Sequence, residues 1–152
     1  MPYTTPKDVL TAFLTLLRAW PTEPLKSAVF RKGPQHSVSL TGAETALVMV
    51  GLANLEGGER SAGVGNNWWH NWNIAVILLV PDDEADPEGT EDTRLDLIEE
   101  FGKFLHANRS VGGTTLVGEM TACELFAEQF FANTKQVFRG AHITVQYRTL
   151  RS

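Results

Sequence analysis

The side chains that could act as nucleophiles, bases or metal ligands are widely spaced along this 152-residue chain. No two of them stand at the spacing of a tetrahedral zinc site. Cys123, the single cysteine, has no basic residue near it in the sequence, which favours a buried, unactivated thiol over a nucleophile. Catalysis needs a nucleophile, a base and an orienting group that can meet, so we expect no enzyme, no catalytic residue, no metal and no cofactor. The remaining candidates of this kind are the histidines His36, His70, His106 and His142.

Two segments of loop-like composition also lack the pattern of a ligand site. Residues 54–67 are rich in glycine, but no Gly-Lys-Ser/Thr follows and the segment leads into a strand, so it does not match a phosphate-binding loop. We expect a flexible loop there, either disordered or in contact with a partner. Residues 81–92 are acidic, yet the ordered glycine and terminal glutamate of a calcium loop are missing. We expect an exposed acidic loop with at most adventitious cation binding.

Three tryptophans, Trp68, Trp69 and Trp72, precede an apolar run at residues 74–80. Such a cluster could stack on sugar rings or on a partner, although alternating tryptophans in a strand more often complete a core. Because side chains alternate along a strand, Trp68 and Trp72 share a face with Ile74 while Trp69 points away. Trp69 is therefore the expected exposed contact.

The charges are segregated along the chain. Thirteen Lys and Arg against eighteen Asp and Glu give a net charge of −5, so affinity for phosphate backbones is not expected. Residues 82–100 hold ten of the eighteen acids against one base, Arg94, whereas no acid follows Glu128 and the first forty residues lean basic. One interpretation is a solvated acidic face. The other is that an acidic face of one copy meets a basic face of the next.

Composition and length place the chain in the ordinary globular class, with one domain over residues 1–152. One cysteine cannot form an internal disulfide, and a reducing compartment is the default. The sequence contains neither an apolar stretch long enough for a bilayer nor the pattern of a signal peptide, so we expect no membrane contact and no export.

The pattern of caps and apolar periodicity predicts a helix, several strands, a second helix and further strands. This order favours a single α+β domain, with a mostly antiparallel mixed sheet and two helices packed on it. Residues 119–133 suit either a helix or a strand. The expected elements are helices at 6–19 and 93–106, an edge strand near 27–31, strands near 37–40, 45–52 and 114–117, a central strand at 68–80, and a half-buried strand at 141–150.

This arrangement resembles the tail terminator, or tail completion, family of long-tailed bacteriophages and related particles. The resemblance rests on the amphipathic first helix, the apolar strand followed by a loop and helix, the Gly112-Gly113 turn and the closing strand at 138–147. It implies a small α+β subunit that forms a six-fold ring, caps the tail tube and presents a surface to the neck. The glycine-rich segment and the Trp-rich strand depart from the family pattern. The family has no catalytic residues to carry over.

The resemblance and the charge segregation together predict interaction surfaces instead of a catalytic site. The implied partners are copies of this chain, the tail tube protein and a neck, stopper or connector protein, without a membrane or sequence-specific nucleic acid. The implied location is the neck or tail end of a virion, after synthesis in the host cytoplasm. The alternatives are another neck component, such as a head-completion or stopper protein, and a ligand-binding or enzymatic domain with a Trp-lined pocket. The expected interface residues are Asp82, Asp83, Glu84, Asp86, Trp69, Arg139, Arg148 and Arg151.

Overall fold

The structure is a computed structural model that describes residues 5–33, 40, 44–57, 69–110, 116–129 and 137–149. The five strands form one sheet in the order β1-β2-β3-β5-β4, in which β1 and β2 are parallel and the other neighbours antiparallel. The expected α+β fold with two helices on a mostly antiparallel mixed sheet is confirmed. In chain order the elements are α1 (Pro6–Arg18), the 3-10 helix η1 (Leu25–Ser27), β1 (Val29–Lys32), β2 (Leu47–Gly57), β3 (Trp69–Pro81), α3 (Pro87–Ala107), β4 (Leu116–Gln129) and β5 (Phe138–Thr149).

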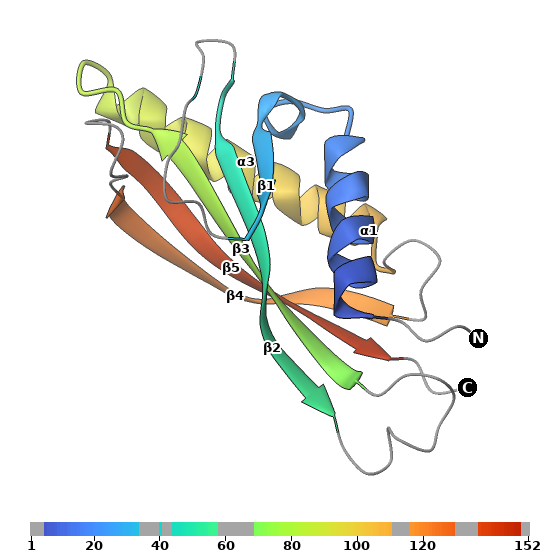
Figure 1. The fold of residues 1–152 in the computed structure, drawn as a ribbon. Helices are drawn as coiled ribbons and strands as arrows, with labels where there is room; N and C mark the ends of the chain where they lie inside the picture. The colour runs from blue at the N-terminus through green and yellow to red at the C-terminus, as the bar shows by residue number, and fades with distance from the viewer. Residues whose placement is uncertain are drawn as a thin grey trace.

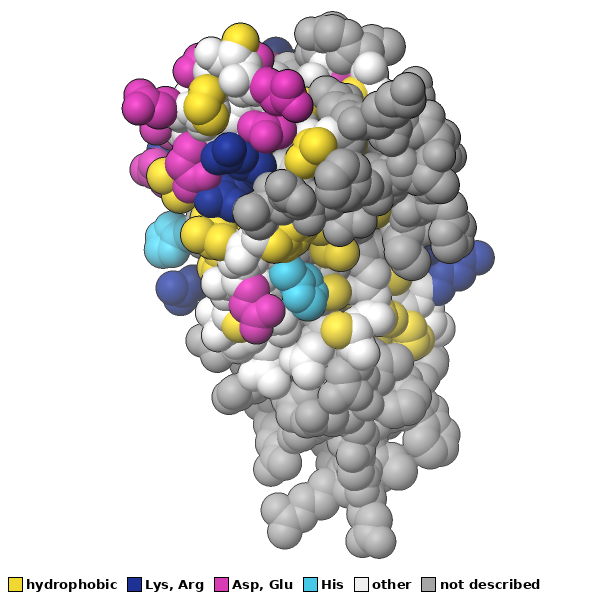
Figure 2. Space-filling model, turned by 90° about the vertical axis from the view of Figure 1, so that its left-hand side faces the viewer, with side chains coloured by type: hydrophobic (Ala, Val, Ile, Leu, Met, Phe, Trp, Pro, Cys, Tyr) yellow, Lys and Arg dark blue, Asp and Glu magenta, His cyan; other side chains and the backbone are white. Residues whose placement is uncertain are grey.

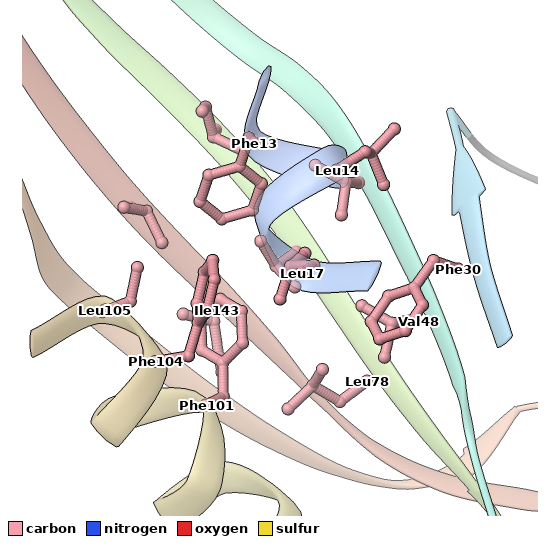
Figure 3. Close-up of a cluster of buried hydrophobic side chains, with 14 of the residues drawn as sticks. Phe13, Leu14, Leu17, Phe30, Val48, Leu78, Phe101, Phe104, Leu105 and Ile143 are labelled. Carbon is pink, nitrogen blue, oxygen red and sulfur yellow. The ribbon is translucent and has the colours of Figure 1, made fainter. Parts of the chain in front are cut away.

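Both helices pack on one face of the sheet. α1 contacts β1 and β2, and α3 contacts β3, β5 and β4 (Figure 1). Between them, Phe13 of α1 and Phe101 and Phe104 of α3 are fully buried against alternate strand residues (Figure 3). The Phe13 ring meets the rings of Phe104 and Tyr147 edge to face, at centroid distances of 5.6 and 6.1 Å. This aromatic cluster fixes both helices to the central strands.

The other face of the sheet carries a smaller apolar cluster that neither α1 nor α3 covers. Leu47 and Met49 of β2 lie there with Leu79 of β3 and Phe138 of β5. Since side chains alternate along a strand, these residues separate the helix-covered face from what we call the open face of the sheet. The same alternation assigns each charged residue of the two edge strands to one face or the other.

The first helix begins where its capping signal predicts. The side chain of Thr5 accepts a hydrogen bond from the backbone N–H of Asp8 at 3.1 Å, and Pro6 occupies the first helical position. The expected helix at residues 6–19 is confirmed within one residue at its end.

The second helix begins earlier than expected. Residues 81–92 were expected to form one acidic loop, but α3 starts at Pro87, so residues 87–92 are its first turns. Asp86 is the N-cap, and its carboxylate accepts from the backbone N–H of Gly89 at 3.0 Å. The pair Asp86-Pro87 repeats the start signal of Thr5-Pro6, and Glu88 in the first turn complements the positive end of the helix. The acidic residues therefore belong largely to a helix start.

The strands follow their apolar patterns. β3 is the middle strand of the five, as its continuous apolar run predicts, and the alternation of residues 141–150 matches β5. The ambiguous residues 119–133 fall mostly in β4, a strand that pairs with β5 along nearly its whole length. β2 runs to Gly57, so residues 54–57 of the expected glycine-rich loop are strand; residues 58–68, like 37–39, lie outside the described part.

Candidate functional site

One of the expected interface acids is already paired within the chain. An Asp82 carboxylate oxygen lies 3.2 Å from Nε of Arg139, and the two side chains are only 17% and 28% exposed. The backbone N–H of Asp82 also donates to the carbonyl of Val137 at 2.8 Å. Asp82 and Arg139 were expected to attract surfaces of different copies, but this pair joins the end of β3 to the start of β5 within one molecule.

Arg94 extends this ion pair into a network that fastens α3 to the sheet. Its Nη2 lies 2.6 Å from both carboxylate oxygens of Glu91, and its Nη1 donates to the carbonyls of Phe126 at 3.0 Å and Gly140 at 3.3 Å. Glu91 also lies 3.8 Å from Arg139. Arg94 is 8% exposed, so the network is held in a poorly hydrated position where charge-assisted hydrogen bonds are strong.

The sheet is shaped to admit this guanidinium. The register of β4 shifts between Phe126 and Gln129, next to the carbonyl that Arg94 reaches. A Cβ at Gly140 would overlap the carbonyl of Leu78 and lie 2.6 Å from the Phe126 ring, so only glycine fits there. The network therefore depends on a β-bulge and on one close backbone approach.

The other expected acids divide into two groups. Asp83 accepts from the backbone N–H of Ala85 at 3.0 Å and Asp86 caps α3, so both shape the turn before the helix. Glu84 is exposed, and among the described residues it has no recorded side-chain partner. Of the acids expected in an interface, Glu84 is the one whose charge can be changed without disturbing a contact seen in the chain.

The structure describes the backbones of two further expected interface residues, Trp69 and Arg148, and no part of a third, Arg151. Trp69 lies in β3 opposite Gly57, and Arg148 lies in β5 opposite Asn71, so their backbones are near one end of the sheet. The side chains of Trp69 and Arg148, and the whole of Arg151, lie outside the described residues. Their roles stay predictions.

The Trp-rich strand contributes to the core. Trp72 is fully buried on the same face as Ile74, as the alternation predicts, and it stands opposite Tyr147 in the sheet. Burial raises the pKa of the Tyr147 phenol well above its ordinary value. Trp72 is therefore not available to line an open pocket.

Trp20 has a role that the sequence pattern does not indicate. Its indole N–H donates to the buried carboxylate of Glu100 at 2.8 Å and so ties the end of α1 to α3. Strand alternation cannot predict this contact, because it joins the residue that follows α1 and its C-cap to the interior of α3.

Cys123 is exposed, so the expectation of a buried thiol is wrong. It lies in β4, which is the last strand of the sheet and has one neighbour, β5, among the strands that the structure describes. The local desolvation raises the pKa of the thiol above its ordinary value, and the positive charge of Arg94 opposes that rise without cancelling it. At neutral pH the group is a thiol and a weak nucleophile, in line with the expected lack of activation.

The histidines described do not meet Cys123 in a catalytic arrangement. His106 is exposed near the end of α3, and His142 stands in β5 opposite Glu124 on the open face. The His70 side chain and all of His36 fall outside the described residues. Within the part of the chain that is described, no three His, Cys, Asp or Glu side chains gather as a metal site would require.

The surface that stands out is the edge formed by α3 and β4. Residues 121–125 of β4 are all exposed, and the large hydrophobic side chains Leu95 of α3 and Leu125 of β4 are 46% and 53% exposed. Figure 2 shows this side of the molecule, with acidic side chains gathered at one end and hydrophobic ones next to them. The sequence does not predict that these two leucines are exposed, because periodicity does not tell which apolar residue lies beyond the edge of a core.

Comparison with models of protein families finds no match to this chain, and no curated protein sequence matches it. Neither α1 nor α3, the helices of the described part, has the combination of length and apolar character that crossing a bilayer requires. The interpretation of the site therefore stands on the chain's own residues and on their arrangement.

The Arg94 network leads to a first prediction. Replacing Arg94 with methionine leaves Glu91 and two carbonyls short of a donor, and we expect the free energy of unfolding to fall by about 3 kcal/mol. Urea unfolding followed by circular dichroism measures this change. As the matched control, Arg109→Met removes an exposed arginine beyond the same helix and changes stability by at most about 0.5 kcal/mol. Equal effects of the two substitutions would contradict the structural role of Arg94.

The raised pKa of Cys123 leads to a second prediction. The thiolate reacts with iodoacetamide and the thiol does not, so the alkylation rate of the folded protein continues to climb beyond the pH at which the rate of the unfolded chain levels off. Mass spectrometry of samples quenched over time gives the rate at each pH, and the urea-unfolded chain serves as the control with an ordinary thiol. A plateau already reached near pH 8 would show an activated cysteine and contradict this description.

Proposed function

We propose that this chain is a structural subunit of a long-tailed phage or tail-like particle, which forms a ring that terminates the tail tube and joins it to the neck. Its partners are copies of itself, the tail tube protein and a neck, stopper or connector protein. The ring is six-fold in the family that the sequence resembles, and we carry that number over as part of the proposal.

The observation that carries the proposal is the difference between the two edges of the sheet. β1 and β4 lie at opposite ends of the strand order, so among the described strands each has a neighbour on one side only. The β4 edge lies beside the acidic helix α3 and has exposed leucines, while β1 carries Arg31 and Lys32. Two unlike, complementary edges favour a heterologous contact, which repeats from copy to copy and closes into a ring when the rotation allows it.

Other features of the structure agree with a binding role. Four acids of α3, Glu88, Asp92, Asp96 and Glu99, are exposed, and such charges raise encounter rates with basic surfaces. The Arg94 network holds that helix rigidly on the sheet, and a rigid surface loses less entropy on docking. A second neck component, such as a head-completion or stopper protein, would use the same features and is the alternative.

Localisation in a particle tests the proposal. Antibodies against this chain are expected to label the junction of head and tail in intact particles by immunogold electron microscopy. Isolated tails and isolated heads separate the alternatives: a terminator labels the end of free tails, and a head-completion protein labels free heads. The control is a capsid antibody that labels heads alone. Labelling of neither fraction, with the chain found free in the lysate, would contradict a structural role in the particle.

A further inference from the structure

The charges of the two sheet edges are of opposite sign. β1 contains Arg31 and Lys32 and no acid, and Arg18 of α1 joins this edge by donating from Nη2 to the carbonyl of Phe30 at 3.3 Å. β4 contains three glutamates and neither lysine nor arginine. The helix α3, which contacts β4, also carries the exposed acids Asp92 and Asp96.

The charges also match face by face. Arg31 follows Phe30, whose side chain is in the helix-covered core, so Arg31 lies on the open face. His142 lies between Ala141 and Ile143, which are buried in the helix-covered core, so His142 lies on the open face. Glu124 stands directly opposite His142 in the sheet and therefore lies on the open face as well. By the same alternation, Lys32 and Cys123 lie on the helix-covered face of their edges.

Protection against aggregation does not account for this pattern. Charged residues on an edge strand prevent unwanted pairing when every copy repels every other. Edges of opposite sign do the reverse, because the β1 edge of one copy attracts the β4 edge of another. They do repel like edges, so contacts between two β4 edges or two β1 edges are disfavoured. The charges therefore select head-to-tail contacts over two-fold symmetric ones.

The exposed leucines give this contact an apolar part. Leu125 and Leu95 lie on the helix-covered side of the acidic edge, and their exposure is the largest among big hydrophobic side chains of the described residues. The methylene stem of a long basic side chain can cover such apolar surface, and Arg18 is an exposed side chain of this kind at the β1 edge. Burying these half-exposed leucines removes apolar surface from water and so favours association.

We propose that the β1 edge of one copy docks on the α3–β4 edge of the next, with Arg31 against Glu124. This inference rests on the proposed ring and specifies its contact. β1 and β4 run in opposite directions within the sheet, so two copies laid edge to edge with the same face up place them antiparallel. The contact is made by side chains, because the edge carbonyl of Phe30 already accepts from Arg18 and Arg31. An antiparallel register that puts residue 31 opposite residue 124 also puts Lys32 opposite Cys123 and Phe30 opposite Leu125.

A charge-swap series measured by sedimentation velocity tests the contact. At low salt the wild-type chain is expected to associate, and added salt weakens the association. Arg31→Glu and Glu124→Arg each place like charges together and lower the association constant by about tenfold or more. The double variant with both changes restores it to within about threefold, since the pair is reversed and the net charge is that of the wild type. Lys7→Glu is the matched control, because Lys7 is an exposed cation at the far end of α1 from Arg18.

Disulfide trapping gives a second measurement that does not depend on the strength of the contact. Lys32→Cys adds a partner for the native Cys123, and mild oxidation at high protein concentration is expected to yield a ladder of covalent oligomers. Thr11→Cys, at an exposed position on α1, is the control and yields no ladder. Efficient dimers of the wild-type chain through Cys123 alone would show that two β4 edges meet and would overturn the proposal.

The possible results separate this inference from the proposed function. Association that neither the swaps nor the trapping affects overturns the β1–β4 contact, while labelling at the neck would keep the ring proposal in place. A chain that stays monomeric at low salt and forms no ladder with Lys32→Cys also overturns the contact. Loss in both single variants, rescue in the double variant and a ladder with Lys32→Cys together establish it.

Discussion

The attachment of α3 to β4 by Arg94 sets the surface on which the proposed function rests. A guanidinium has five donors in one plane, so a single side chain reaches Glu91 on its own helix and the carbonyls of Phe126 and Gly140 on two strands. Because Arg94 holds the helix there, the acids of α3 and the exposed strand β4 lie on one side of the molecule. The apolar packing of Phe101 and Phe104 holds α3 on the central strands, and Arg94 adds the polar attachment on the β4 side.

The acidic block of the sequence thus does two things. Some of its members are internal: Asp82 pairs with Arg139, Asp86 caps α3 and Glu91 holds Arg94. Others face solvent and give the α3–β4 edge its charge. A count of charges along the chain cannot separate these two groups, because the difference lies in which partner each carboxylate meets after folding. The basic counterpart that we propose is the β1 edge. The sequence also pointed to the C-terminal strand, where the side chain of Arg148 and all of Arg151 lie outside the described residues.

Much of the fold could be predicted from the sequence, because its signals are local. The Thr5-Pro6 pair marks the start of α1, and the apolar run before Pro81 marks a central strand. The start of α3 was missed although Asp86-Pro87 carries the same signal, since the surrounding acids suggested a loop. Long-range features were out of reach: the exposure of Cys123 depends on β4 being an edge strand, and strand order is not encoded in any single segment.

Electron cryomicroscopy of the neck in an intact particle tests the central claim most directly, because it shows whether copies of this chain meet and through which surfaces. The account predicts a closed ring of this chain at the end of the tail tube, with β1 of each copy next to β4 of its neighbour and no empty edge between them. A neck in which this chain is absent, or in which both edges of its sheet face solvent, would contradict it.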